Sequence, residues 1–300
     1  MKHLLSLRDY SEKEILDLIS LAEQIKKNPK KFKNELQNKT LLMIFAKPSL
    51  RTHLSFDLAV YHLGGHAIYY DLSHSPLGKK ESLKDGAKVM SRYVNLIMAR
   101  LYEHTEMLEL AKYSSVPVIN GLDNEEHPCQ ALGDLLTIKE KFKKLKGLTL
   151  TYLGDANNNV THSLMYACSK VGMNMIISCP NKKEFMPNAQ ILKEAKRKGK
   201  IEVVFDPKKA VKNADVIYTD TWQSYHIKDS EMKSRAKILG QYQVNNKLFS
   251  INKKMLFMHC LPAKRGMEVT DDVIDSKRSI VYDQAENRMW IQMAILLKLI

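Results

Sequence analysis

Residues 41–52 read LLMIFAKPSLRT, a stretch that indicates the fold by itself. Its first five residues, Leu41 to Phe45, are all apolar, which is typical of a strand buried on both faces of its sheet. Pro48 then breaks the strand because proline lacks a backbone N–H. A helix is predicted from about Thr52, and it should stop at the paired glycines 64 and 65. The stretch therefore predicts an apolar strand, a polar loop and a helix, in that order.

The same order recurs along the chain. Further apolar strand candidates are Ala67–Tyr70, Leu96–Ala99, Val116–Ile119, Leu148–Leu153, Met175–Ser178, Ile201–Phe205, Val216–Thr219 and Leu256–Met258. Amphipathic stretches, which predict helices, include Ser82–Tyr93, Gln130–Phe142, Ala189–Lys198 and Met289–Leu299. Ser11 and Glu14 form a capping box that predicts one more helix near the N-terminus. Repetition of strand and helix favours parallel sheets covered by helices. The predicted fold class is α/β, with two domains, each a parallel sheet flanked by helices, and a cleft between them.

The length of 300 residues suits two domains of ordinary size. We expect the division between Gln130 and Gly147, where a helix ends in a Lys-rich stretch before the strand at Leu148. Residues 1–140 are predicted to form one domain, on which a C-terminal helix of about residues 284–300 packs back. Residues 141–283 are predicted to form the other.

Composition excludes several protein classes. With 44% hydrophobic and 27% charged residues, the chain is neither disordered nor fibrous. No apolar run approaches the ~18 residues that are needed to cross a bilayer. Arg8 interrupts the short apolar stretch near the N-terminus, so we expect no signal-peptide core. The cysteines are too far apart for a C-x-x-C pair: Cys129, Cys168, Cys179 and Cys260. We therefore expect a cytoplasmic protein without a disulfide framework or a membrane partner.

The net charge of +14 leaves a choice of partners open. The lysines concentrate in two stretches, Lys26 to Lys39 and Lys139 to Lys146, and neither contains the interleaved aromatics that would stack nucleic-acid bases. We interpret them as a solvated surface and expect no nucleic acid, although net charge alone would favour an RNA-associated protein. A positive field that attracts a phosphorylated substrate is the functional alternative.

Polar residues follow the predicted strands. The segments in question are Lys47–Thr52, Arg100, His127–Gln130, Asp155 with Asn157–Asn159, Asp220–Trp222 and His259–Pro262. In open parallel sheets, ligands bind beyond the carboxyl ends of the strands. Both halves of the chain therefore direct polar loops toward a predicted ligand site, which is typical of a two-domain enzyme.

The segment Ser49–Thr52 is suited to an anion. Hydroxyls and backbone N–H groups gather at a helix N-terminus, which carries partial positive charge and accepts phosphate. Arg51 adds a planar, permanently charged guanidinium. Taken alone, the segment is equally consistent with an ordinary N-cap beside a surface arginine.

Metal and cofactor signals are weak. His127 and His259, each taken alone, are better explained as structural histidines bonded to backbone carbonyls, and no H-E-x-x-H or paired C-x-x-C spacing accompanies them. Gly154-Asp155-Ala156 follows a strand but lacks the second and third glycines of a dinucleotide loop. We therefore expect no metal and no cofactor.

Four motifs carry a family resemblance. Ser49-Leu50-Arg51-Thr52, His127-Pro128-Cys129-Gln130, Asp220-Thr221-Trp222 and His259-Cys260-Leu261-Pro262, in this order, resemble the aspartate/ornithine carbamoyltransferase family over essentially the whole chain. The second motif points to carbamoyl phosphate and the fourth to the ornithine-type branch. The resemblance implies a transferase that moves the carbamoyl group from carbamoyl phosphate to the side-chain amine of L-ornithine, giving L-citrulline and phosphate.

The resemblance also implies site residues. Carbamoyl phosphate would be bound in the first domain by Ser49, Leu50, Arg51, Thr52, Arg100, His127, Gln130 and Arg288. Ornithine would be bound in the second by Asn159, Asp220, Ser224, Tyr225, Cys260 and Leu261. Arg51, Arg100, His127 and Cys260 are the implied catalytic residues. The family implies a homotrimer or a multiple of trimers.

The sequence departs from the family pattern at a few positions. Leu50 and His53 replace the second and last residues of Ser-Thr-Arg-Thr-Arg, and Pro76 replaces a Gln or His. Tyr225-His226 stands in place of the Met-Gly of Ser-Met-Gly. These departures leave two alternatives open: a transcarbamylase for a related amine, such as putrescine or an acylated ornithine, and a catalytically weakened binding or regulatory paralogue.

Overall fold

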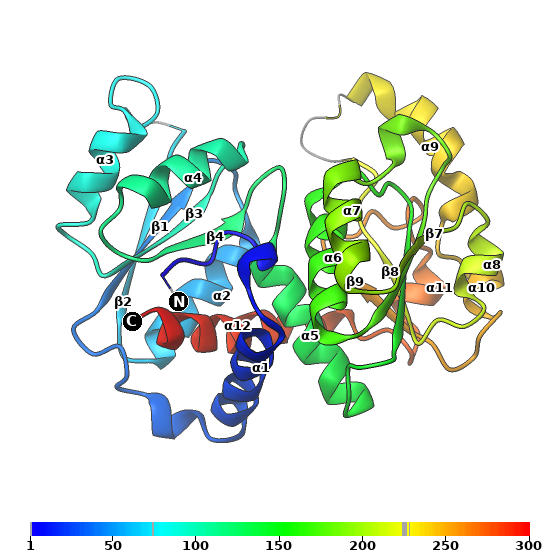
Figure 1. Cartoon of the computed structure of the whole chain (residues 1–300), viewed down its shortest axis with the longest axis horizontal. Coiled ribbons are helices and arrows are strands. Elements are labelled where there is room, and N and C mark those ends of the chain that lie inside the picture. Colours follow the sequence, from blue (N-terminus) through cyan, green and yellow to red (C-terminus); the bar gives the residue numbers. More distant parts are fainter. Residues whose placement is uncertain (1, 74, 224–226, 228) are drawn as a thin grey trace. The chain divides into compact units, whose positions relative to one another are not determined.

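A computed structural model describes residues 2–73, 75–223, 227 and 229–300 of the chain (Figure 1). It divides into two compact units, of which the first comprises Met1–Leu136 with Glu286–Ile300 and the second Thr137–Ala285. The divisions fall within two helices, α5 (Pro128–Phe142) and α12 (Val281–Leu299).

The sheet of the first unit is parallel, with the strand order β2-β1-β3-β4. Its strands are β1 (Thr40–Phe45), β2 (His66–Asp71), β3 (Leu96–Arg100) and β4 (Val118–Leu122). β3 is buried along its whole length, as its continuous apolar run predicts, whereas β2 lies at the sheet edge and is largely exposed. β4 begins two residues later than predicted, directly after a proline that cannot donate to the ladder.

Helices cover both faces of this sheet. Figure 1 shows α3 (Leu83–Met90) and α4 (His104–Tyr113) on one side, and α2 (Leu50–His62) on the other. Apolar residues of α3 and α4 pack against alternate residues of β1 and β3 in one buried cluster. α1 (Glu12–Lys27) begins at the capping box of Ser11, which confirms that prediction.

The sheet of the second unit is also parallel, with the order β7-β6-β5-β8-β9. Its strands are β5 (Thr149–Leu153), β6 (Asn174–Ser178), β7 (Ile201–Val203), β8 (Val216–Thr219) and β9 (Leu256–His259). The surrounding helices are α6 (Asn159–Val171), α7 (Ala189–Lys198), α8 (Pro207–Val211), α9 (Met232–Leu239), α10 (Asn246–Phe249) and α11 (Asp271–Ile274). The predicted α/β fold class, with parallel sheets flanked by helices, is confirmed in both units.

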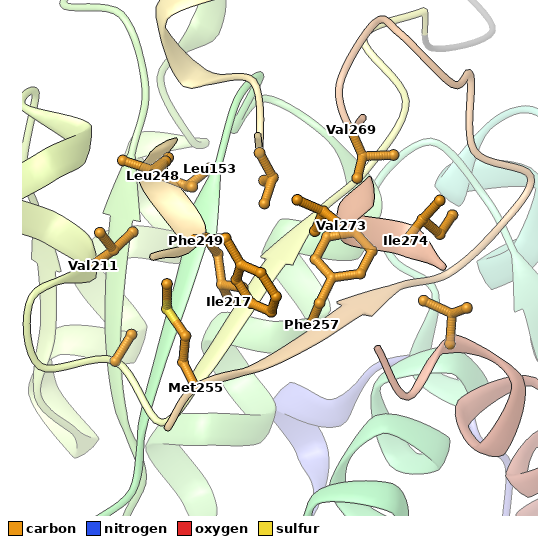
Figure 2. Packing of buried hydrophobic residues seen from close by; sticks show 13 residues of the cluster. Leu153, Val211, Ile217, Leu248, Phe249, Met255, Phe257, Val269, Val273 and Ile274 are labelled. Carbon is orange, nitrogen blue, oxygen red and sulfur yellow. The ribbon is translucent and has the colours of Figure 1, made fainter. Parts of the chain in front are cut away.

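The core of the second unit lies on both faces of its sheet. Figure 2 shows Ile217 and Phe257 of the sheet packed with Phe249 of α10 and Val273 of α11. Tyr218, next to Ile217 in β8, points to the opposite face of the sheet, where it stacks on Tyr152 of β5. Both tyrosines are fully buried. The two faces together fix the register of the central strands.

The strand register aligns the polar loops at one edge of each sheet. In the first unit Phe45 pairs with Arg100, so β1 and β3 end at the same level. In the second, Thr219 pairs with both Leu153 and His259, so β5, β8 and β9 also end together. The loops that follow these strands therefore begin side by side within their own unit, as the sequence predicts.

Short 3-10 turns complete the fold: Leu7–Asp9, Pro29–Phe32, Lys183–Phe185, Asp229–Glu231 and Gly240–Tyr242. In the part of the chain that the structure describes, none of the helices combines the length and apolar character that a membrane span needs.

Candidate active site

The N-terminus of α2 is the first element of the candidate site. Ser49 is its N-cap, and the Ser49 hydroxyl accepts a hydrogen bond from the Thr52 N–H at 3.2 Å. The helix therefore begins at Leu50, two residues earlier than predicted, because Ser49 caps its first turn. The Leu50 side chain is 68% exposed, so this residue offers the site its backbone only. A helix of this length supplies partial positive charge at its start.

Two arginines converge on the Thr52 hydroxyl. Arg100, at the end of β3, lies with its guanidinium 3.4 Å from Thr52 Oγ1, and Arg288, from α12, lies 3.3 Å from the same atom. Arg288 also donates to the Gln130 side chain at 2.5 Å, and Gln130 donates onward to Asp134 at 2.8 Å. All five side chains are buried. Side chains from four elements of the first unit thus hold two guanidinium groups in fixed positions.

His127 is buried among these charges. Burial lowers the pKa of His127 well below its ordinary value, and the positive charges of Arg288, Arg100 and Arg51 lower it further. The imidazole is therefore neutral at physiological pH, and it contributes a hydrogen-bonding group without a charge. The positive charge of the site comes from the arginines, which suits a dianion bound next to a neutral carbonyl group.

Lys47 belongs to the same cluster, although sequence reasoning did not select it as a site residue. Its ammonium lies 4.3 Å from the centre of the Tyr102 ring, and its side chain is buried. Burial, and next the charge of Arg100, lower the pKa of Lys47 to about 8. In the sequence Lys47 is one lysine among many, and only its place in the polar segment two residues after the first strand distinguishes it.

The Lys47 pKa predicts a pH dependence. Lys47 is charged below about pH 8 and neutral above it, so attraction for a phosphate dianion should weaken as pH rises through that value. We expect the Kd for the phosphate dianion, measured by calorimetry and corrected for the ionisation of free phosphate, to rise about tenfold between pH 7 and pH 9. In Lys47→Met that rise should shrink to about twofold or less. An unchanged slope in Lys47→Met would separate Lys47 from the anion site.

Asp220 and Cys260 meet in the second unit. The Cys260 thiol donates to Asp220 Oδ1 at 2.9 Å, and the same carboxylate oxygen accepts the Thr221 N–H at 2.7 Å. They come from the ends of the neighbouring strands β8 and β9. Asp220 is buried and Cys260 half-buried, so the pair offers a carboxylate beside a thiol at the sheet edge.

His259 supports the turn that carries Cys260. Its Nδ1 accepts the Leu261 N–H at 2.8 Å, which requires the proton on Nε2, and Nε2 donates to buried Glu268 at 3.3 Å. Leu261 has φ +58, a left-handed conformation that side chains other than glycine rarely adopt. The histidine therefore helps to hold an unfavourable turn in place, and it bonds to a backbone N–H and a carboxylate.

Asp220, His259 and Cys260 also bring three possible metal-ligand atoms within 4.8 Å of one another. Each of these atoms, however, already has a hydrogen-bond role: both His259 ring nitrogens are engaged, and the thiol donates to the carboxylate. A metal ion would have to replace these bonds.

The remaining predicted residues lie at the same edge or outside the described residues. Asn159 is the first residue of α6, which Asn158 caps by accepting the Thr161 N–H at 2.9 Å. Ser224 and Tyr225, predicted to bind ornithine, fall outside the residues that the structure describes.

One ion pair near this edge was missed by sequence reasoning. Asp155, two residues after β5, bonds to Arg235 of α9, and both side chains are buried. Eighty positions separate them, and Arg235 lies in a helix with ordinary surface composition. Only the three-dimensional structure pairs them.

The chain matches two family models. The first, described as aspartate/ornithine carbamoyltransferase, carbamoyl-P binding domain, matches residues 2–140. The second, described as aspartate/ornithine carbamoyltransferase, Asp/Orn binding domain, matches residues 146–299.

Relatives match over almost their full length. The ornithine carbamoyltransferase of Archaeoglobus fulgidus is 48% identical, over 100% of this chain and 98% of that protein. Among solved structures, the ornithine carbamoyltransferase of Pyrococcus furiosus has a TM-score of 0.93 and 47% identity, covering 98% of this chain and 96% of that one. The ornithine transcarbamoylase of Giardia lamblia has a TM-score of 0.90 and 40% identity, covering 99% and 97%.

Proposed function

The chain belongs to the aspartate/ornithine carbamoyltransferase family, and we propose that it transfers the carbamoyl group of carbamoyl phosphate to the side-chain amine of L-ornithine, giving L-citrulline and phosphate. Relatives named ornithine carbamoyltransferase, which match over almost their full length, support the ornithine assignment. The observation that carries the proposal is the cluster around the start of α2, where the guanidinium groups of Arg100 and Arg288 both contact the Thr52 hydroxyl and their charges act on the buried, neutral His127.

In the first unit, the phosphate of carbamoyl phosphate binds at the start of α2. Ser49, the Leu50 backbone, Arg51 and Thr52 hold its oxygens, since the helix terminus and the arginine both favour a dianion. Arg100, His127, Gln130 and Arg288 hold the carbamoyl end. The Thr52 contacts of Arg100 and Arg288 support this assignment, because they place both guanidinium groups beside the helix terminus.

In the second unit, the amino-acid substrate binds at the ends of β5, β8 and β9. Asp220 is the only group of the proposed set with a full negative charge, and it pairs with the substrate α-ammonium group. Asn159, Cys260 and the Leu261 carbonyl complete the contacts, together with Ser224 and Tyr225 of the sequence prediction. The 2.9 Å bond between Cys260 and Asp220 supports a shared site.

The chemistry follows from these groups. The neutral side-chain amine attacks the carbamoyl carbon, a C–N bond forms, and a tetrahedral oxyanion develops. The C–O bond to phosphate then breaks, and the proton lost by the amine ends on the leaving phosphate, which departs as the dianion HPO₄²⁻. Arg100, His127 and Thr52 donate to the oxyanion, and Arg51 offsets charge on the leaving phosphate. These steps require no metal or cofactor.

An assay of carbamoylated products from several amines tests the function. Purified protein is supplied with carbamoyl phosphate and, separately, L-ornithine, putrescine, an N-acylated ornithine and L-aspartate. We expect kcat/KM for L-ornithine to exceed that for every other amine by at least about tenfold. A preference for putrescine or the acylated amine would assign the related transcarbamylase instead. Failure of all four amines to react would favour the inactive paralogue.

An apolar stripe on α2 supports the trimer. Leu50, Leu54, Leu58 and Tyr61 are spaced along one helix face, and their side chains are 44% to 72% exposed. Ile68 of the edge strand β2 is exposed as well. Surface patches of this kind usually mark protein–protein interfaces. We include a homotrimer, or a multiple of it, in the proposal, with a cytoplasmic location that the four free cysteines support.

The assembly has its own test. Light scattering should give a mass that is a multiple of three chains, and Leu58→Glu should reduce it to that of one chain, since a carboxylate replaces a contact of the apolar stripe. Lys88→Glu introduces the same residue at an exposed position of α3 and should leave the mass unchanged. A fully active monomer at all concentrations would contradict the trimer.

A further inference from the structure

The ion pair between Asp155 and Arg235 is buried, and each of its side chains has a further partner. Asp155 is 2% and Arg235 8% exposed. The other Asp155 oxygen accepts the Asn157 N–H at 3.0 Å, and the Arg235 guanidinium lies 4.6 Å from the centre of the Phe185 ring. Burying two charges is costly unless their geometry is fixed, and breaking such a pair is strongly destabilising. The pair therefore holds two segments in one relative position.

These two segments carry the proposed amino-acid site. Asp155 lies in the loop between β5 and α6, four residues before Asn159. Arg235 lies in α9, within the connection between β8 and β9 that starts with Asp220. The ion pair links the loop that carries the amide ligand to the connection that carries the carboxylate ligand.

The packing of Trp222 is a second contact that holds the same connection in place. Trp222, two residues after Asp220, is 3% exposed and packs with Phe185 and Tyr242. Gly154 has φ +120, and a Cβ there would lie 3.1 Å from the Trp222 indole nitrogen. Glycine therefore permits both the turn after β5 and the close approach of the indole. Phe185 takes part in both the ion-pair region and the Trp222 packing, because it packs with Trp222 and lies against the guanidinium of Arg235.

The charges near Asp155 also bear on Asp220. Burial raises the pKa of Asp155 to about 6, Arg235 acts against that rise, and the Asp220 charge adds to it. Arg235 thus neutralises one of two neighbouring carboxylates. Asp220 is left as the carboxylate that faces a cationic substrate group.

We propose that Asp155 and Arg235 are positioning residues for the amino-acid substrate: their ion pair sets the relative placement of Asn159 and Asp220, and so the affinity for L-ornithine. This inference rests on the proposed function. It differs from a purely structural role, which would change stability without changing KM. It also differs from a long-range electrostatic role, in which removing a positive charge and removing a negative charge would change KM in opposite directions.

Steady-state kinetics of four variants test the pair. Arg235→Gln and Asp155→Asn should each raise the KM for L-ornithine about tenfold, with kcat changed less than about threefold and the KM for carbamoyl phosphate unchanged. The double variant contains no unpaired buried charge, and its KM should stay raised by about the same factor, because the link itself is missing. Arg235→Lys keeps the charge but loses the planar fork, so its KM should fall between that of the wild type and that of Arg235→Gln. Arg197→Gln, at an exposed arginine of α7, is the matched control and should behave as the wild type.

Fluorescence provides a readout that does not depend on turnover. In a Trp290→Phe background Trp222 is the remaining tryptophan, and its burial predicts emission at short wavelength. Arg235→Gln should shift this emission to longer wavelength, whereas Arg197→Gln should not.

The outcomes separate the two claims. A wild-type protein that forms no citrulline overturns the proposed function. A wild-type protein that forms citrulline overturns the positioning role alone if the double variant has a wild-type KM, or if the two single variants change KM in opposite directions. An unshifted Trp222 emission in Arg235→Gln would also count against it, and unfolding of a single variant leaves the double variant and Arg235→Lys to decide.

Discussion

Replacing Arg51 with alanine should lower kcat/KM for carbamoyl phosphate by about 10²- to 10³-fold, the usual effect of removing one preorganised charged donor. Arg51 is the second residue of α2, beside the Ser49 cap, and its charge contributes to the low pKa of His127. The guanidinium is therefore close to the group that we assign to the carbamoyl carbonyl. Because the leaving phosphate gains charge in the transition state, kcat should fall as well as the affinity for carbamoyl phosphate.

Arg92→Ala is the matched control for this prediction. Arg92 is an exposed arginine of the same unit, so its loss removes the same charge from the protein without touching the start of α2. Its kcat/KM should stay within about twofold of the wild type. If Arg51→Ala folds and turns over normally, Arg51 does not bind the phosphate, and the ordinary N-cap interpretation of Ser49 applies.

The sheets were largely predictable from sequence because their strands are buried on both faces. Leu96–Ala99 and Val216–Thr219 are continuous apolar runs, and both are strands in the structure. Polar residues directly after these runs, such as Arg100 and Asp220, mark the carboxyl ends of parallel strands. The family resemblance is confirmed by family models that match nearly the whole chain.

Helices without a polar face were harder to predict. Nearly every residue of α6 is buried, so the segment lacks the alternation of polar and apolar faces on which amphipathic patterns depend. α12 begins at Val281, three residues before the predicted start at about residue 284 and eight before the amphipathic stretch from Met289, because its first turns include polar residues that are themselves buried, among them Gln284 and Asn287. Tertiary burial decides both cases, and a local pattern does not record it.

The same reason explains which site residues escaped prediction. Arg235 contacts a residue that is distant in the sequence. Glu268 contacts a nearby histidine, but in the sequence it resembles an ordinary surface charge. Lys47 lies in a polar segment that the sequence indicates, but its burial against Tyr102 is evident only from the structure. The roles assigned to Arg51, His127 and Cys260 stay predictions, supported by the positions of these residues at the expected edges.

Asp220→Asn should lower kcat/KM for L-ornithine by about 10²- to 10³-fold, which corresponds to about 3 to 4 kcal/mol. Asparagine keeps the size of the side chain, and its amide oxygen can still accept from the Cys260 thiol, which is 2.9 Å away in the wild type. The change therefore removes the charge without removing the local packing. The KM for carbamoyl phosphate should change less than about threefold, since its proposed ligands lie in the other unit.

Two further measurements show whether the charge of Asp220 acts as proposed. The Asp220 charge raises the pKa of Asp155, so Asp220→Asn should lower that pKa from its value of about 6, as carboxyl carbon NMR would record. An N-acylated ornithine lacks the α-ammonium group, so any slow turnover of it should be affected by Asp220→Asn less than about threefold. Asp272→Asn, at an exposed aspartate of α11, should match the wild type with both amines. Equal losses for L-ornithine and the acylated amine would mean that Asp220 does not bind the α-ammonium group, and that it acts through Cys260 instead.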